Sequence, residues 1–298
     1  MAEFAVDHAD DAILPACFAL LPQLASPDAI VFAARAMDGS LLGAGAVLWR
    51  AWQNPAGLPT WIEVLPEHRR RGVGRALLDA LATVAAQEAD RLWSIRPIDE
   101  AGDAARFAGA CGATADKRQL YFETTNLDFL TQMTRIVDRL AAHGRVSDDF
   151  VVEALAERHL DQVKWLIFDE LTTTPPQLNA MLARAMIEPP ETAPIDRERS
   201  FVLVADGIVA GALLSQRVTD PPAANIICNV VDPRWRRGAA NALLLQRFSE
   251  ETVAHGHTHI RFDCDEHVRD TIGLAKRSEA DHLRTESYFA YAIAARMP

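Results

Sequence analysis

The hydrophobic positions fall into short apolar runs that alternate with longer stretches in which apolar residues recur every three to four positions. The short runs are typical of strands and the longer stretches of helices, and turn residues such as Asp38-Gly39 separate them. For the first half of the chain the pattern predicts elements at Phe4–Val6, Asp10–Leu24, Ile30–Ala36, Leu41–Trp49, Thr60–Leu65, Gly74–Gln87, Arg91–Ile95, Gly102–Cys111 and Arg118–Glu123.

The same order of elements recurs downstream, and Asp206-Gly207 repeats the hairpin turn. The second set is predicted at Phe150–Ala154, Glu157–Asp169, Phe201–Ala205, Ile208–Gln216, Asn225–Val231, Ala239–His255, His259–Asp263, Val268–Arg277 and Leu283–Ala294. The sequence therefore predicts two consecutive copies of one α/β fold, each built on a mixed sheet.

The two copies are joined near residues 126–147. Asn126 is expected to cap a helix that ends at Gly144. Its apolar stripe is Leu127, Leu130, Met133, Val137 and Leu140. We therefore predict an N-terminal domain at 1–125, a linker helix at 126–147 that packs on a domain, and a C-terminal domain at 148–298. A proline-rich stretch at 172–194 is read either as a lid or as a passive surface loop or a contact with the first domain.

A basic loop with two glycines follows the strand at Thr60–Leu65. It reads Pro66-Glu-His-Arg69-Arg-Arg-Gly72-Val-Gly74 and leads into an apolar helix. Glycines let the backbone turn and approach a phosphate closely. The helix start adds unpaired N–H groups and a partial positive charge. The combination predicts an anion-binding loop.

The strand, the proline and the spacing Arg69-x-x-Gly72-x-Gly74 resemble the pyrophosphate loop of the GNAT (Gcn5-related N-acetyltransferase) superfamily. The resemblance covers nearly the whole chain and implies two tandem GNAT folds. It also implies that loop amides bind the pyrophosphate of acetyl-CoA, that the strand pairs with the pantetheine arm, and that splaying from Arg91–Ile95 makes the thioester slot. The implied cofactor-binding residues are Ile62, Val64, Leu65, Arg69, Arg70, Arg71, Gly72, Val73, Gly74 and Arg75.

The second copy of the loop, around Gly238, is one residue shorter between its proline and its glycine. Counting back from that glycine puts Trp235 where the family has Arg or Gln, and Ala240 stands where the family has its second glycine. We therefore expect the first domain to bind acetyl-CoA. The C-terminal domain either binds CoA as well or serves as a scaffold or a wall of the acceptor site.

The chemistry of transfer to an amine calls for a group that takes the amine proton, and often for a tyrosine that protonates the leaving thiolate. Ala108 stands where the family usually has that tyrosine. The candidate catalytic residues are Glu63, which strand alternation aims away from the expected face, Asp99 and Glu100 after a strand, and Tyr121 on a late strand. A relay through water would need no dedicated base.

Composition limits the partners. The net charge of −11 argues against broad nucleic-acid binding and is compatible with small cationic acceptors. The four cysteines form no C-x-x-C pair, and the histidines at 255, 257 and 259 are expected to be an exposed loop, so no metal is predicted. The first residues are acidic and no apolar run approaches the length of a membrane helix, so we expect a cytoplasmic protein without a membrane partner.

Together these features predict an N-acetyltransferase that moves an acetyl group from acetyl-CoA to a primary amine of a small molecule, or of a peptide, by direct attack. The alternative is a non-catalytic acyl-CoA-binding module, favoured by the missing tyrosine. The acyl chain length and the oligomeric state stay open.

Overall fold

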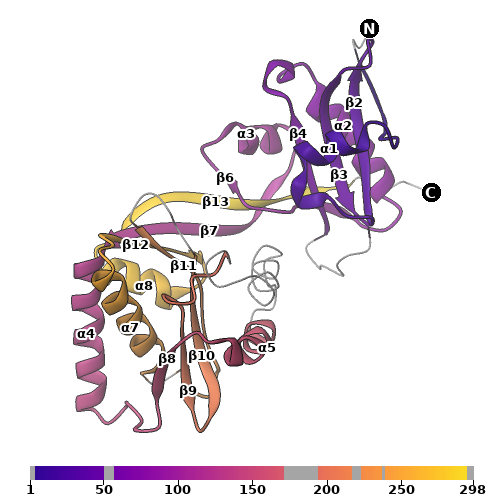
Figure 1. Ribbon diagram of the computed structural model, residues 1–298. Helices are drawn as coiled ribbons and strands as arrows, with labels where there is room; N and C mark the ends of the chain where they lie inside the picture. Colours follow the sequence, from indigo (N-terminus) through magenta and orange to yellow (C-terminus); the bar gives the residue numbers. More distant parts are fainter. Residues whose placement is uncertain (1–3, 50–56, 171–193, 217–222, 237–238, 294–298) are drawn as a thin grey trace. The chain divides into compact units, whose positions relative to one another are not determined.

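The computed structural model describes residues 4–49, 57–170, 194–216, 223–236 and 239–293 (Figure 1). The chain divides into two compact units: unit 1 is Met1–Gln119 with Thr285–Pro298, and unit 2 is Leu120–Arg284. Unit 1 thus includes the last residues of the chain, which the sequence-based division assigns to the C-terminal domain. The proline-rich stretch, except Pro194, lies outside the described residues, as do Arg237 and Gly238.

Unit 1 is built on a mixed sheet whose strands follow the order β1-β2-β3-β4-β5-β13. All neighbours in it are antiparallel except β4 and β5, which are parallel. Its elements are β1 (Phe4–His8), α1 (Leu14–Leu20), η1 (Pro22–Leu24), β2 (Ala29–Ala36), β3 (Leu41–Leu48), β4 (Leu58–Val64), η2 (Pro66–His68), α2 (Val73–Ala85), β5 (Arg91–Ser94), β6 (Ile98–Asp99), α3 (Asp103–Ala110), the start of β7 (Thr114–Thr125) and most of β13 (Asp281–Ala292).

Helices α1 and α2 cover opposite faces of this sheet (Figure 1). Helix α2 turns one apolar stripe inward, because its apolar residues recur at helical spacing. That stripe is Val73, Leu77, Leu78, Leu81 and Ala85, all buried. On the other face, Cys17 of α1 is buried with Leu21 and Leu24. Each leucine that is buried completely contributes about 1.5–3 kcal/mol to stability, so both faces are held firmly around the strands.

Strand β13 completes the sheet of unit 1 beside β5. Ala290 faces Trp93 and Ala292 faces Arg91 in the antiparallel register. The ring of Tyr288 stacks on that of Trp93 with 4.3 Å between the ring centroids, and both side chains are buried. The sequence pattern predicts this strand, at Leu283–Ala294, but counts it with the second copy, because local periodicity does not reveal which sheet edge a strand will join.

Unit 2 repeats the architecture, with strands in the order β7-β12-β11-β10-β9-β8. Helices α4 and α7 pack on one face of its sheet and α5 on the other. Its elements are the end of β7, α4 (Asn126–Ala142), β8 (Val151–Ala154), η3 (Glu157–His159), α5 (Leu160–Glu170), β9 (Phe201–Ala205), β10 (Ile208–Gln216), β11 (Ala223–Val231), α7 (Ala240–Ala254), β12 (His259–Asp265), α8 (Arg269–Arg277) and the start of β13.

Helix α4 corrects two details of the expected linker helix. Its N-cap is Thr125, whose hydroxyl accepts from the Asp128 amide, and not Asn126. Asn126 is buried because its amide group donates to the Thr252 hydroxyl at 2.9 Å. The stripe is also rotated: Leu127 is 66% exposed, while Phe129 and Met133 are buried in the core of unit 2. The helix is therefore part of unit 2 itself.

The internal repeat is visible in the registers. Gly43 faces Val64 at the end of β4, and Gly211 faces Val231 at the end of β11. Both hairpin turns form as predicted, with positive φ angles at Gly39, Asp206 and Gly207. The expectation of an α/β fold with mixed sheets in two copies is confirmed.

Candidate acyl-CoA site in unit 1

The two parallel strands at the centre of unit 1 diverge. Strand β4 pairs with β5 only over Leu58–Thr60, and the last backbone bond runs from the Ile95 amide to the Thr60 carbonyl at 3.0 Å. Strand β4 continues to Val64, paired with β3 on its other side. Its edge toward β5 is therefore open from Trp61 onward, and an extended chain could add there as a strand.

A loop with unpaired amides follows the open edge. Gly72 is the N-cap of α2 and has a φ of +84°, a conformation that favours glycine, and no side chain caps the helix. Among the described residues, the amides of 70–75 have no recorded acceptor, whereas the Ala76 amide already donates to the Gly72 carbonyl. A Cβ at Gly72 would meet nothing within 4 Å, so the space beside Gly72 itself is open. Such a helix start favours an anion.

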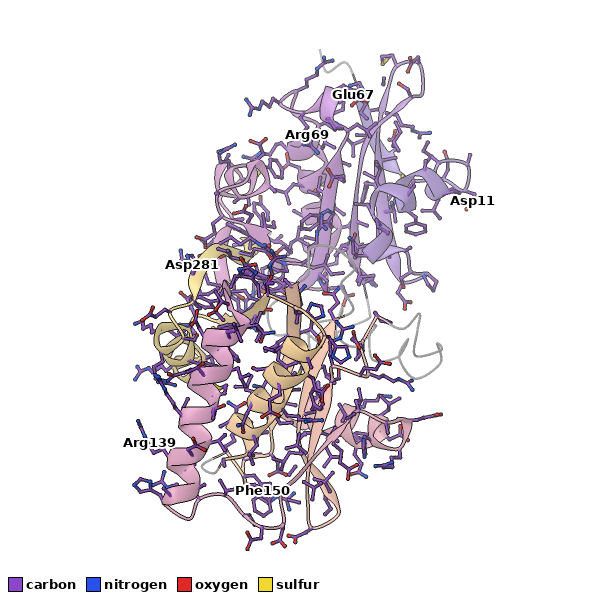
Figure 2. The ribbon with its side chains drawn as sticks, turned by 60° about the vertical axis from the view of Figure 1, so that its left-hand side comes forward. Asp11, Glu67, Arg69, Arg139, Phe150 and Asp281 are labelled. Carbon is purple, nitrogen blue, oxygen red and sulfur yellow. The ribbon has the colours of Figure 1, made fainter. Side chains whose placement is uncertain are left out.

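The arginines of the loop are mostly held by the protein. Arg69 donates through Nε to the Val64 carbonyl at 3.0 Å and pairs with Glu63 at 3.0 Å. Figure 2 labels Arg69, with Glu67, on this segment before α2. Arg70 lies 3.5 Å from a carboxylate oxygen of Asp103.

Of the other two loop arginines, one is bound to the protein and the other is not. The Arg75 guanidinium donates to the Ala110 carbonyl at the end of α3. Arg71 is exposed and, in the described chain, has no recorded partner, so it is the arginine that can turn to a phosphate without breaking a contact.

Alternation along β4 separates two faces. Ile62 and Val64 pack against the cluster that contains α2. Trp61 and Glu63 point to the other face, where Trp61 packs against the cluster that contains α1. Glu63 therefore lies where strand alternation predicts it, and its carboxylate is engaged by Arg69. Leu65 donates its amide to the Leu42 carbonyl and anchors the start of the loop.

Glu100 is held by a network of its own. Its carboxylate accepts hydrogen bonds from the hydroxyl of Ser287 and from Nε of Arg118 at 2.8 Å. The Ser287 bond and then Arg118 lower the pKa of Glu100, against the opposing effect of partial burial. A carboxylate that is stabilised in this way is a weaker base. The main effect of Glu100 in this structure is therefore to link its own segment to β13.

The other two catalytic candidates have different surroundings. The Asp99 side chain is exposed and accepts from the Ala101 amide at 2.9 Å. Tyr121 belongs to unit 2, and the Arg284 guanidinium carbon lies 4.1 Å from the centre of its ring. The catalytic assignments of these residues stay predictions.

The loop of unit 2 corrects the sequence alignment. Arg236 donates through Nε to the Val231 carbonyl at 2.9 Å, as Arg69 does to Val64. Arg236 and not Trp235 is therefore the structural counterpart of Arg69. The sheet register places Val64 of β4 and Val231 of β11 at the ends of equivalent strands, so the two loops are aligned by counting forward from these residues. The residue that the second loop lacks then falls after the arginine. Trp235 instead packs edge-on against Phe150.

Two contacts in unit 1 are not predicted by the sequence. Arg96 follows β5, and its guanidinium carbon lies 4.2 Å from the centre of the Trp61 ring. Phe107 of α3 lies against Gly74, where an added Cβ would come within 3.2 Å of its ring. The signal for Arg96 was its position just after a strand that was expected to splay.

Diverging central strands beside an uncapped, glycine-started helix define an acyl-CoA N-acyltransferase fold of the GNAT type. Residues 27–112 match the family model described as acetyltransferase (GNAT) domain. A tandem GNAT protein from the clavulanic acid biosynthesis pathway, solved without acetyl-CoA, aligns over 98% of this chain and 99% of its own, with 17% identity and a TM-score of 0.60.

Other solved structures give the same result. A GCN5-related N-acetyltransferase from Sphaerobacter thermophilus covers 98% of this chain and 96% of its own, with 15% identity and a TM-score of 0.54. A probable N-acyltransferase from Enterococcus faecalis covers 99% and 74%, with 12% identity and a TM-score of 0.64. No curated protein matches the sequence. Residues 27–112 thus match a GNAT domain model, and the chain as a whole has the tandem GNAT fold.

The described part of the chain contains no helix long and apolar enough to cross a membrane. Over the same residues, no group of three or more His, Cys, Asp or Glu side chains is placed to hold a metal ion. The three histidines around His257 therefore form no such cluster where they are described.

Proposed function

We propose that this protein transfers an acetyl group from acetyl-CoA to a primary amine of a small molecule, and that unit 1 carries the reaction. The family and the fold support an acyl-CoA-dependent N-acetyltransferase in general. The choice of acetyl as the acyl group, of a small amine as acceptor and of unit 1 as the active unit is our inference.

One observation carries the proposal: the unpaired amides of residues 70–75 lie directly after the open edge of β4. The pyrophosphate fits the amides, because a helix start with no side-chain cap offers several N–H groups to one anion. The pantetheine arm, which carries amide groups, fits the free edge from Trp61 to Val64 as an added strand. Four residues of strand span about 13 Å, so the loop lies about that far from the point of divergence. This separation is roughly the length of an extended pantetheine arm.

The reaction needs little from the protein beyond position. The neutral amine nitrogen attacks the thioester carbonyl carbon, the new C–N bond forms, the C–S bond breaks, and CoA leaves as a thiolate that takes up a proton. Holding amine and thioester together can supply much of the rate. Glu63 and Asp99 are the carboxylates that we propose accept the amine proton, directly or through water. Glu100 is the weaker proposal, because its hydrogen bonds favour the ionised form.

The competing proposal is a non-catalytic acyl-CoA-binding module, and Ala108 favours it, because no tyrosine hydroxyl is available from that position of α3. Two measurements separate the proposals. Calorimetry with CoA and acetyl-CoA tests binding, and release of free thiol in the presence of a panel of amines tests transfer. Binding with amine-dependent thiol release supports the transferase, and binding without release on any amine supports the module. No heat at millimolar CoA refutes both.

A further inference from the structure

The point where β4 and β5 diverge is bridged by a cation on an aromatic ring. Trp61 is the first residue of β4 beyond the paired segment, and Arg96 is the second residue after β5. The guanidinium carbon of Arg96 lies 4.2 Å from the centre of the Trp61 ring. The indole is held in turn by the cluster that contains α1. The cation is thus kept in place by a ring that is itself packed.

Arg96 has no acidic partner in the described chain. No ion pair or hydrogen bond is recorded for its guanidinium, although acids are close in sequence to both residues of the pair. Glu63, two residues from Trp61, is paired with Arg69, and Glu100, four residues from Arg96, is bound by Ser287 and Arg118. The contact with the Trp61 ring uses none of the Arg96 N–H groups in an ion pair, so these donors stay available.

Trp61 lies on the face of β4 that is turned toward α1. On the other side of β4, Ile62 and Val64 are packed against α2. Trp61 and Arg96 are only partly buried. A thioester at the point of divergence would lie beside Trp61 and Arg96.

We infer that Arg96 binds a carboxylate carried by a substrate of the transfer reaction, so that this enzyme acts on an amino acid or a related amine with an acidic group. The inference rests on the proposed function, because it takes the divergence of β4 and β5 as the place of the thioester. A guanidinium with a free edge matches a carboxylate through two parallel N–H···O bonds. The same carboxylate could also be the end of a dicarboxylic acyl group, such as succinyl, and the test has an arm for each source.

The test compares Arg96→Met with the wild type on matched substrates. The acceptor arm measures kcat/KM for amino acids and for their amides with acetyl-CoA, and takes the ratio of wild type to variant for each, so that differences in amine basicity cancel. The acyl arm measures the affinity for succinyl-CoA and butyryl-CoA by calorimetry, and needs no turnover. We expect a loss of about 30-fold on the carboxylate member of one arm, from a charge-assisted bidentate contact, and less than about twofold on its neutral match.

Controls separate charge, fork geometry and folding. Arg96→Lys keeps the charge without the planar fork and should lose part of the effect, on the order of fivefold. Arg139→Met removes an exposed arginine from α4 and should change nothing (Figure 2). The affinity for CoA itself should be the same in all variants, which also shows that each is folded.

Equal ratios for the carboxylate and neutral members in both arms would overturn the role of Arg96, while normal CoA binding would leave the acetyl-CoA proposal standing. Absence of CoA binding by the wild type would instead overturn the proposed function and this inference with it.

Discussion

Gly72→Glu is the sharpest test of the proposed anion site, because the structure separates strain from charge at this position. Gly72 has a φ of +84°, and a Cβ there would meet nothing within 4 Å. A side chain therefore costs about 1 kcal/mol in backbone strain and nothing in overlap. The new carboxylate would lie beside the amides of residues 70–75, where we place the pyrophosphate.

The magnitude follows from the charges. Two unit charges 4 Å apart repel by about 1 kcal/mol in water and about 4 kcal/mol at an effective dielectric constant of 20. A pyrophosphate carries two charges, and the carboxylate also competes for the loop amides. We expect the Kd for CoA to rise more than about 100-fold, since about 1.4 kcal/mol corresponds to each tenfold change. Isothermal calorimetry measures this directly.

Gly39→Glu is the matched control, because Gly39 has a φ of +86° and nothing within 4 Å of a Cβ, but lies in the turn between β2 and β3. It should lose a similar amount of stability and bind CoA as the wild type does. Gly72→Ala should lose that stability too and keep most of the affinity. Wild-type affinity in Gly72→Glu, or an equal loss in Gly39→Glu, would show that the loop does not hold the pyrophosphate.

Three further predictions concern stability. Gly43→Ala should lower the free energy of unfolding by about 1–3 kcal/mol, because the new Cβ would come within 2.7 Å of a backbone carbonyl oxygen of β4 and force β3 and β4 apart. Urea titration measures this loss, and an unchanged midpoint would contradict the prediction. Because its hydrogen bonds lower the folded pKa of Glu100 from 4.5, its ionised form stabilises the protein above about pH 4.5, and this contribution disappears as pH falls through the folded pKa. Ser287→Ala should therefore lose stability at pH 7 and lose progressively less in acid; a loss independent of pH from 7 to 3 would argue against this coupling. Tyr288→Ala should destabilise unit 1 by about 3 kcal/mol, because it removes a buried ring stacked on an indole, and hydrogen exchange of β5 amides should rise; unchanged exchange there would mean that β13 does not secure this edge.

The sequence was sufficient for what depends on local pattern. The repeat, the two hairpin turns and the stripe of α2 all depend on residues close together in the chain, such as Leu77 and Leu81 one turn apart. The start of α2 at Gly72 could be predicted for the same reason, because Gly72 and the helix after it are contiguous. The open edge of β4 beyond Thr60 also follows the expectation that the two strands splay.

What the sequence did not reveal depends on partners distant in the chain. Thr125 caps α4, while the side chain of Asn126 makes a buried hydrogen bond with Thr252, 126 residues away. The sequence alone did not identify Arg236 as the counterpart of Arg69, because counting back from Gly238 takes no account of the sheet register. The commitment of Glu100 to Ser287, 187 residues away, could not be foreseen from either segment alone.

The position of β13 has a consequence for biosynthesis. The ribosome makes β5 well before β13, the strand that covers its edge, so a nascent chain must carry an unpaired edge at β5 until β13 emerges. Folding of unit 1 is thereby coupled to the synthesis of β13, which follows all of unit 2 in the sequence. A premature stop codon before residue 285 would therefore damage unit 1, although most of unit 1 had already been made.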